Sequence, residues 1–171
     1  MEKIFNNIDN GILETFSNKG LKAYGLCELV QKDGKPNPVM VGRNKKGNRE
    51  PAQIHDRQDG IFYHRFLSGS FTDDEEFSFG DKMARRFIGR VRTVLAYKIQ
   101  LGEQFIFDFV KAFPDKIDSL TEYKFVHLSQ GTLIADHEAV YIQEYGDNSY
   151  EKHRTPWNIY ALEYDIEFIL C

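Results

Sequence analysis

The chain has 171 residues, a length typical of one domain, so we expect a single domain over residues 1–171. It is 42% hydrophobic and 14% aromatic with only 5 prolines, which argues against intrinsic disorder because disordered segments carry few aromatics. Its 22 basic and 26 acidic side chains give a net charge of −4, which excludes a protein whose whole surface is a nucleic-acid footprint.

The sequence also argues against a membrane protein and against several enzyme classes. No segment approaches the roughly 18–20 consecutive apolar residues of a membrane span, and residues 1–7 lack the basic flank of a secretory signal. Two cysteines, Cys27 and Cys171, are too few for a disulfide framework. Motifs of phosphate-binding loops, serine hydrolases and zinc proteases do not occur in the sequence. We therefore expect no catalytic residues, no metal and no cofactor.

The chain begins with a pattern typical of an amphipathic helix. Apolar residues recur at three- and four-residue spacings from Ile4 to Phe16, and Gly20 is well placed to end the helix. Residues 21–30 and 39–41 are extended in character and are separated by turn-forming residues, which predicts a hairpin with a long connection.

A polar stretch over residues 42–60 interrupts the regular elements, and we expect it to be a loop. A loop of this length is uncommon in a compact domain unless it has a function or is disordered. Residues 61–66 then predict a strand that ends at 68–70, and residues 73–76 predict an acidic loop. The 42–60 loop is locally basic because it carries Arg43, Lys45, Lys46 and Arg49.

Residues 83–99 fit two patterns. Read as a helix, they form one apolar stripe; read as a strand, they alternate between an apolar face and a basic face. Gly89, Thr93 and several β-branched residues favour the strand. The basic face of this strand then holds Arg86, Arg90, Arg92 and Lys98.

The following segments predict a helix, two short strands and a short helix. Apolar spacing predicts a helix over 102–113, closed by the next proline. Residues 123–128 and 132–135 read as strand pieces. Asp136 is a plausible N-cap for a short helix that ends before Gly146.

Residues 160–170 give the clearest strand signal, with apolar and acidic residues in strict alternation. Such alternation is typical of an antiparallel sheet covered on one side only. We therefore expect an α+β fold, in which an N-terminal helix and a second helix pack on one face of an antiparallel sheet, with one short helix in addition.

The five histidines raise the question of a metal site. The rival to a non-catalytic protein is a small metal-dependent hydrolase or nuclease that uses His55, Asp56, His64 and His137. Nothing in the spacing of these residues forces them together, so we expect no metal site. Paired carboxylates, including Glu144 on the short helix, are expected to form a charged solvent face rather than an acid–base pair.

Two rows of charge complement one another. The strand over 83–99 offers its basic row, and the last strand offers Glu163, Asp165 and Glu167. If the strands are neighbours in one sheet, the rows form cross-strand ion pairs. If the rows belong to different subunits, they set partner choice and register. The sequence leaves both arrangements open and favours pairing within the chain.

The order of elements resembles a known family. The chain opens with a helix, which is followed by the hairpin and the polar loop. The basic–apolar strand comes next and leads through 99–102 into a helix ending at Phe113-Pro114. The last two elements are the short helix DHEAVYIQEYG and the final strand WNIYALEYDIEFIL. This order resembles the tail-terminator, tail-completion and head–tail connector proteins of tailed bacteriophages.

The resemblance implies a non-enzymatic virion protein, assembled in the host cytoplasm, that forms a six- or twelve-fold ring between portal and tail rings around the DNA channel. Lys45 and Lys46 would make inter-ring or channel-facing contacts, with non-specific DNA contact as one option. Phe62, Tyr63, Trp157 and Tyr160 would make subunit contacts, since aromatics are enriched in interface cores. A third reading, a monomeric binding module unrelated to phages, remains open at this point.

Overall fold

The computed structural model describes residues 1–31, 39–43, 48–53, 57–79, 82–114, 116–117, 123–129, 131–145 and 157–170. Within these ranges it has a mixed α+β fold, as expected. In chain order the elements are α1 (Glu2–Thr15), β1 (Leu21–Leu26), β2 (Glu28–Val30), β3 (Val39–Arg43), β4 (Arg49–Pro51), β5 (Gly60–Phe79), β6 (Lys82–Lys98), the 3₁₀-helix η1 (Ile99–Leu101), α2 (Gln104–Lys111), β7 (Lys116–Ile117), β8 (Tyr123–Leu128), β9 (Thr132–Ile134), α3 (His137–Tyr145) and β10 (Trp157–Leu170).

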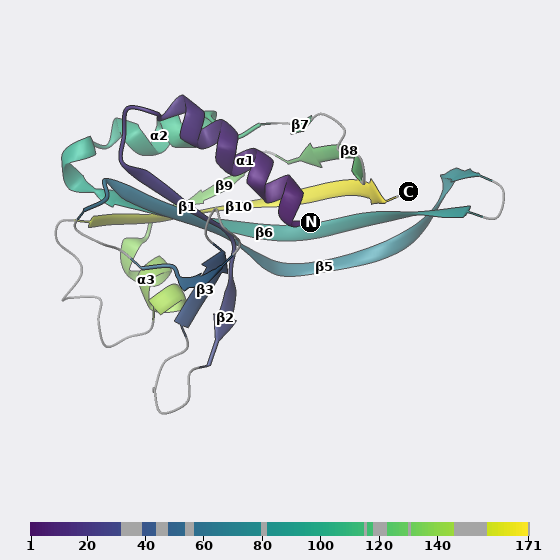
Figure 1. Cartoon of the computed structure of the whole chain (residues 1–171), viewed down its shortest axis with the longest axis horizontal. Helices are drawn as coiled ribbons and strands as arrows, with labels where there is room; N and C mark the ends of the chain where they lie inside the picture. The colour runs from purple at the N-terminus through teal and green to yellow at the C-terminus, as the bar shows by residue number, and fades with distance from the viewer. Residues whose placement is uncertain are drawn as a thin grey trace.

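One long curled sheet organises the molecule (Figure 1). Its strand order is β1-β5-β6-β10-β8-β7, with β9 also paired to β10. The neighbouring pairs are antiparallel, as expected, except that β1 runs parallel to β5. A second sheet of three short strands, β2-β3-β4, forms beside it, and its β2–β3 pair is the predicted hairpin.

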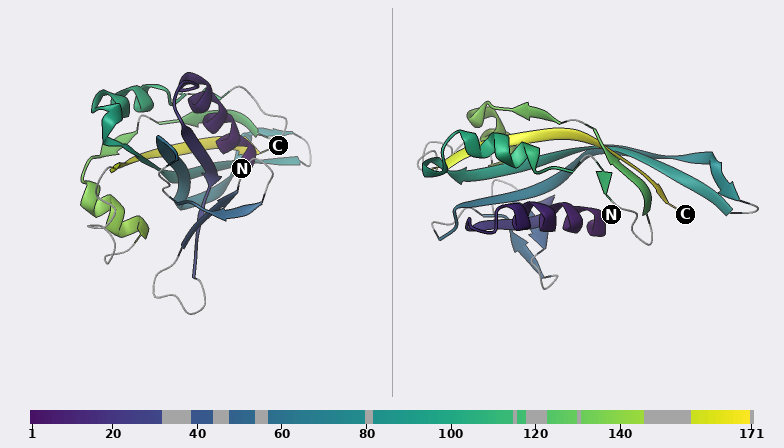
Figure 2. Two further views of the ribbon diagram at one scale, coloured as in Figure 1. Left: turned by 60° about the vertical axis from the view of Figure 1, so that its left-hand side comes forward. Right: turned by 90° about the horizontal axis from the view of Figure 1, so that it is seen from above.

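Helices α1 and α2 cover the face of the main sheet that we call the front face (Figure 2). The stripe predicted for α1 is buried there, with Ile4, Phe5, Ile8 and Ile12 all 1% exposed or less. Phe105, Ile106 and Phe109 of α2 enter the same core. Because β10 alternates, its residues Leu162, Tyr164, Ile166 and Phe168 meet both helices on this face.

The opposite, back face is also covered at one end, so the expectation of a sheet covered on one side only is wrong there. A second core joins Tyr63, Val94 and Ala161 of the sheet to Val140 and Tyr141 of α3 and to Met40 of β3. Ile159 and Ala161 precede the acidic residues on this face of β10 and provide its apolar surface. The acidic alternation that begins only at Glu163 hid this second core.

Strands β5 and β6 form a hairpin much longer than predicted. The segments 68–70 and 73–76 were expected to be a strand end and a loop, but both belong to β5, which pairs with β6 through Gly69–Gly89 and Phe71–Phe87. The Phe87 ring lies over these glycines, since a Cβ at either Gly69 or Gly89 would come within 2.5 Å of the ring. The small residues that suggested a turn instead make room for an aromatic ring.

Other predictions are confirmed with adjusted bounds. The segment predicted over 83–99 is strand β6 (Lys82–Lys98) rather than a helix, and Ile99 begins η1. Asp136 caps α3, because its carboxylate accepts a hydrogen bond from the backbone N–H of Ala139 at 3.0 Å.

The expectation of one continuous loop over 42–60 is wrong, since Arg49–Pro51 form β4 and pair with β3.

Candidate functional site

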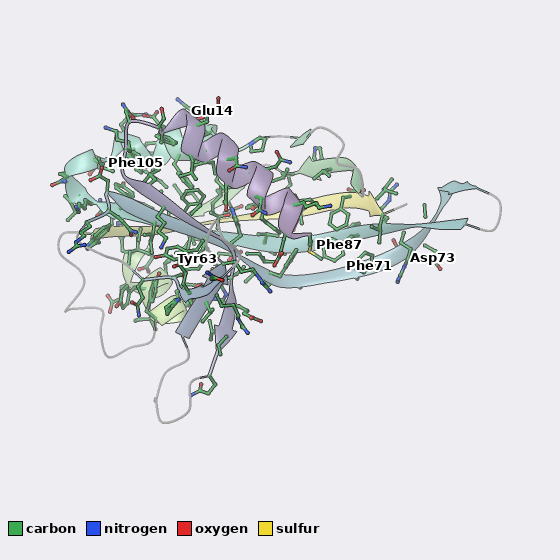
Figure 3. The ribbon with its side chains drawn as sticks, viewed as in Figure 1. Glu14, Tyr63, Phe71, Asp73, Phe87 and Phe105 are labelled. Atoms are coloured by element: carbon green, nitrogen blue, oxygen red, sulfur yellow. The ribbon has the colours of Figure 1, made fainter. Side chains whose placement is uncertain are left out.

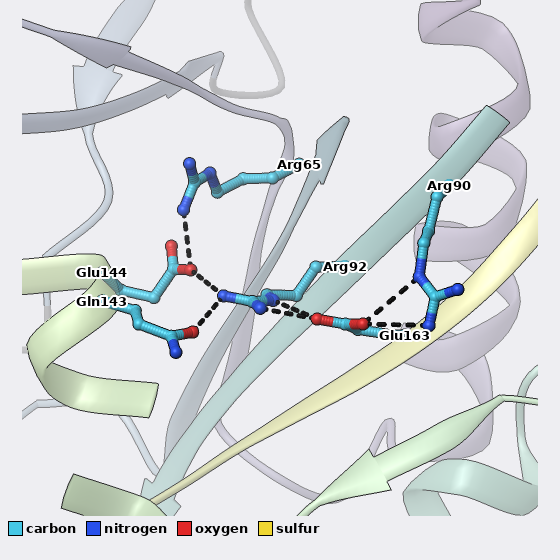
Figure 4. Close-up of polar contacts among 6 residues, drawn as sticks. All are labelled: Arg65, Arg90, Arg92, Gln143, Glu144 and Glu163. Atoms are coloured by element: carbon cyan, nitrogen blue, oxygen red, sulfur yellow. Dashed lines mark hydrogen bonds and ion pairs between the residues drawn. The ribbon is translucent and has the colours of Figure 1, made fainter. Parts of the chain in front are cut away.

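A network of arginines and carboxylates lies on the back face beside α3 (Figure 4). Arg92 and Glu163 are directly opposite one another on β6 and β10, and Arg92 Nε donates to Glu163 Oε1 at 2.9 Å. Arg90 donates to the other oxygen, Oε2, from Nε at 3.3 Å and from Nη2 at 3.2 Å. Two guanidinium groups thus hold one carboxylate in a fork geometry.

Glu144 joins this network from α3, and the expectation that it faces solvent is wrong. Its side chain has no exposed surface. It accepts hydrogen bonds from Arg65 at 2.7 Å, from Arg92 at 3.2 Å and from the Tyr63 hydroxyl at 3.1 Å. A usable signal was present in the sequence, because Glu144 lies four residues after Val140 and therefore shares its buried helix face.

The network is held in its charged form. Burial by itself would raise the pKa of Glu163, but hydrogen bonds and charge from Arg92 and Arg90 outweigh burial and lower it. The pKa of Arg92 is raised, because its bonds to Glu163 and Glu144 outweigh the effect of burial. Burial raises the pKa of the Tyr63 hydroxyl well above its usual value. These groups keep their protonation states near neutral pH, which suits anchoring better than proton transfer.

The predicted basic and acidic rows therefore meet within one chain. Besides the network, Arg86 pairs with Glu167 at 2.7 Å. Asp165 lies opposite Arg90 in the register and is exposed. Of the two arrangements left open by the sequence, the structure has the cross-strand pairing of β6 and β10. Arg86, Arg90, Arg92, Glu163 and Glu167 consequently anchor the sheet and α3.

The aromatic residues expected at subunit contacts lie mostly inside the chain, which corrects that expectation. Phe62 and Tyr63 are fully buried and Trp157 is 6% exposed. Phe62 belongs to the front core and Tyr63 to the back core, because consecutive strand residues point to opposite faces. Tyr160 is half-buried and stacks on Tyr97 with ring centroids 5.9 Å apart. Lys45 and Lys46 lie outside the described residues.

Among the described residues, His64 and His137 do not come together as the metal site of the hydrolase reading. His64 is fully buried, and its two ring nitrogens contact Asp9 at 2.8 Å and Thr93 at 2.6 Å, so neither nitrogen is open to a metal. The His137 ring nitrogen Nδ1 lies against the backbone of Ile159. His55 and Asp56 lie outside the described residues. Across the described part of the chain, no group of three or more histidines, cysteines or carboxylates gathers as a metal site.

A cleft of about 430 Å³ opens where β1 leaves the edge of β5. Leu26, Leu29, Val41 and Phe66 give it apolar walls, and it also contains Glu2, Cys27, Glu28, Gly42, Arg43, Arg49 and Arg65. Arg43 pairs with Glu2 at 2.9 Å, and Arg49 pairs with Glu28; all four side chains are more than half exposed. Burial raises the pKa of the Cys27 thiol, so this cysteine is not a reactive thiolate.

The far half of the β5–β6 hairpin begins in the front core, which contains its Phe87 and Val91, and its tip extends beyond both cores (Figure 3). We call residues 66–79 and 82–91 the arm. Phe71 and Ile88 lie on opposite faces of the arm and are 40% and 47% exposed. Arg85 lies over the Phe71 ring, 4.9 Å from its centroid, and reaches Asp73 only at 3.9 Å. The last residue of β10, Leu170, is opposite Arg85, so β5 and β6 continue past the rest of the sheet.

In the described residues, no helix is both long and apolar enough to cross a membrane. No protein-family model matches the chain, and no curated protein matches it.

Proposed function

We propose that this chain is a non-catalytic structural subunit that forms a homo-oligomeric ring at the head–tail junction of a tailed bacteriophage, where it docks on portal or tail rings around the DNA channel. Its action is assembly: the subunits fold, close into a ring by head-to-tail contacts and then meet the neighbouring ring.

The arm is the observation that carries this proposal. Of the eight large apolar side chains that are exposed among the described residues, Leu67, Phe71 and Ile88 lie on the arm and Leu170 lies beside it. Apolar side chains gathered on a projecting element mark an interaction surface more often than isolated ones do. The tip of the arm, beyond the pairing of Arg85 with Leu170, extends past the rest of the sheet and is well placed to reach another subunit.

The phage setting rests on the order of elements. The structure has the opening helix α1, the β2–β3 hairpin, the long strand β6 that leads through η1 into α2, the short helix α3 and the final strand β10. This is the order on which the resemblance to tail-terminator and connector proteins depends. The resemblance supplies the virion location and the ring, and the arm supplies a surface through which a ring could close.

The mass of the purified protein in solution tests the proposal. We expect light scattering to give a mass several times the 19.9 kDa of one chain at high protein concentration, and electron microscopy to show closed particles with a central hole. A protein that remains monomeric at millimolar concentration and forms no rings would contradict the proposal and favour the monomeric binding module.

A further inference from the structure

We propose that the ring contact is an exchange between copies: the acidic end of the arm of one copy binds in the cleft between β1, β3 and β5 of the next. This inference rests on the proposed function and identifies the two surfaces through which neighbouring copies bind one another. The arm and the cleft differ in shape and charge, so the contact is head-to-tail and can continue around a ring.

The arm offers an apolar side chain followed by negative charge. Phe71 is 40% exposed, and the sequence then continues with Asp73, Asp74, Glu75 and Glu76. The Asp73 side chain is 67% exposed and meets Arg85 only at 3.9 Å. The outer edge of β5 beyond Phe66 has no neighbouring strand among the described residues, since β1 pairs only with residues 60–64. The arm therefore offers the exposed ring of Phe71 and the Asp73 carboxylate on an open strand, with three further acidic residues next in the sequence.

The cleft offers the complementary surface. Apolar side chains line it, including Leu29, which is 42% exposed. Three arginines and two glutamates also line it, which leaves it net positive before the acidic arm arrives. Arg65 connects the cleft to the network around α3, because it lines the cleft and donates to the buried carboxylate of Glu144 at 2.7 Å. A carboxylate bound beside Arg65 would be linked directly to the network that anchors α3.

The ion pairs already present in the cleft do not prevent this binding. Arg43–Glu2 and Arg49–Glu28 join side chains that are more than half exposed, and exposed pairs contribute little to stability. A guanidinium group has five N–H donors, and one carboxylate cannot use all of them. An incoming carboxylate can therefore share Arg49 with Glu28 without a large loss.

The partner is a second copy because the arm points away from the cleft of its own chain. Figures 1 and 3 show the arm leaving the body beyond Phe71 and Asp73, whereas the β2–β3 hairpin beside the cleft extends in a different direction. The complementary surfaces are thus parts of one sequence that cannot meet within one molecule. Electrostatic complementarity of this kind selects partner and register.

Charge reversal on the two surfaces tests the exchange. The arm variant is Asp73→Lys with Asp74→Lys, and the cleft variant is Arg49→Glu. Matched controls are Glu14→Lys with Asp108→Lys, and Lys111→Glu, which make the same charge changes at exposed positions of α1 and α2. Far-UV circular dichroism and thermal melting verify that each variant folds, and light scattering over a range of protein concentrations gives the oligomer mass.

We expect the arm and cleft variants each to weaken self-association at least about tenfold, while the controls behave like the wild-type protein. An equimolar mixture of the arm and cleft variants should associate again, because the cleft variant keeps an intact arm, the arm variant keeps an intact cleft, and the two reversed surfaces carry opposite charges.

Each other outcome separates the two proposals. If the wild-type protein forms rings and both variants match their controls, the arm–cleft exchange is wrong and the ring stands. If the wild-type protein stops at a dimer that requires both surfaces, the exchange stands and the ring is wrong. If the wild-type protein remains monomeric and the variant mixture does not associate, both are wrong.

Discussion

Glu144 is a carboxylate with no exposed side-chain surface, and it holds α3 to the sheet through three donors on two strands. Arg65 and Tyr63 reach it from β5 and Arg92 from β6. Replacing such a group by a residue that cannot accept hydrogen bonds takes this carboxylate from Arg65 and the Tyr63 hydroxyl and leaves Arg92 with Glu163 alone as its carboxylate partner. That penalty exceeds the stabilisation expected of an ordinary surface ion pair.

We predict that Glu144→Ala destabilises the protein by about 3–5 kcal/mol, the usual cost of breaking a buried ion pair. Glu138→Ala is the control, because Glu138 is in the same helix and exposed, and its effect should be within about 0.5 kcal/mol. Urea denaturation followed by circular dichroism measures both. Equal, small effects of the two substitutions would show that the network does not anchor α3.

His64 is a second buried polar side chain whose hydrogen-bond partners join a helix to the sheet. Its ring lies between Asp9 of α1 and Thr93 of β6, and Thr93 also contacts the Tyr164 hydroxyl at 3.2 Å. The order carboxylate, imidazole, hydroxyl is that of a catalytic triad, but Asp9, His64 and Thr93 are each 6% exposed or less. With no substrate access to the hydroxyl, the three groups satisfy one another and join helix to sheet.

At the scale of elements, the arm depends on two glycines that face each other on neighbouring strands. The Phe87 ring lies over them and meets Phe66, Phe71 and Phe168 around its edge and face. A ring that covers glycine backbone protects it from water and adds packing where the strand has no side chain of its own. Gly69 and Gly89 therefore determine the shape of the arm where it leaves the front core.

We predict that Gly89→Ala lowers the free energy of unfolding by about 1–3 kcal/mol, because its Cβ would lie 2.5 Å from Phe87 Cε1 and 3.1 Å from the Ser68 carbonyl oxygen. Gly11→Ala is the matched substitution in α1, where nothing lies within 4 Å of the new Cβ. It should stabilise the protein by about 0.5–1 kcal/mol through helix propensity. Thermal melts of both variants give the comparison, and the same sign for both would contradict it.

Elements with a strong period were predictable from the sequence, and those that depend on partners were not. The stripe of α1, the alternation of β10 and the cap at Asp136 give α1, β10 and α3 within a few residues. The extension of β5 through 68–76 was hidden, because glycine, serine and acidic residues resemble a turn until a paired strand such as β6 is known. Burial of Glu144 likewise depends on Arg65 and Arg92, which lie far away in sequence.

For the molecule as a whole, the pairing of Glu163 makes stability depend on pH. Its pKa is lowered in the folded chain by Arg92 and Arg90, so the unfolded chain binds the proton first as the pH falls. The stabilisation is therefore present above about pH 4.5, near the ordinary pKa of a glutamate, and is lost as the pH falls through the lower folded value.

We predict that Glu163→Gln is less stable than the wild-type protein at pH 7 by about 1–2 kcal/mol and that this difference shrinks between pH 5 and pH 3. Chemical denaturation at a series of pH values measures the difference in the free energy of unfolding between the two proteins. The control is Glu103→Gln, an exposed position at the start of α2. If the stability difference between Glu163→Gln and the wild-type protein stays constant down to pH 3, the pKa of Glu163 is not lowered in the folded chain.

The place of β10 in chain order also bears on how the protein is made. This strand lies in the middle of the sheet, yet it follows each of its partners β6, β8 and β9 in the sequence. A nascent chain that has reached residue 156 has already synthesised α1 and the arm but has no strand to complete either core. Its apolar faces stay open until β10 leaves the ribosome. Completion of both cores therefore waits for β10, and a growing chain that still lacks this strand is a natural client for chaperones.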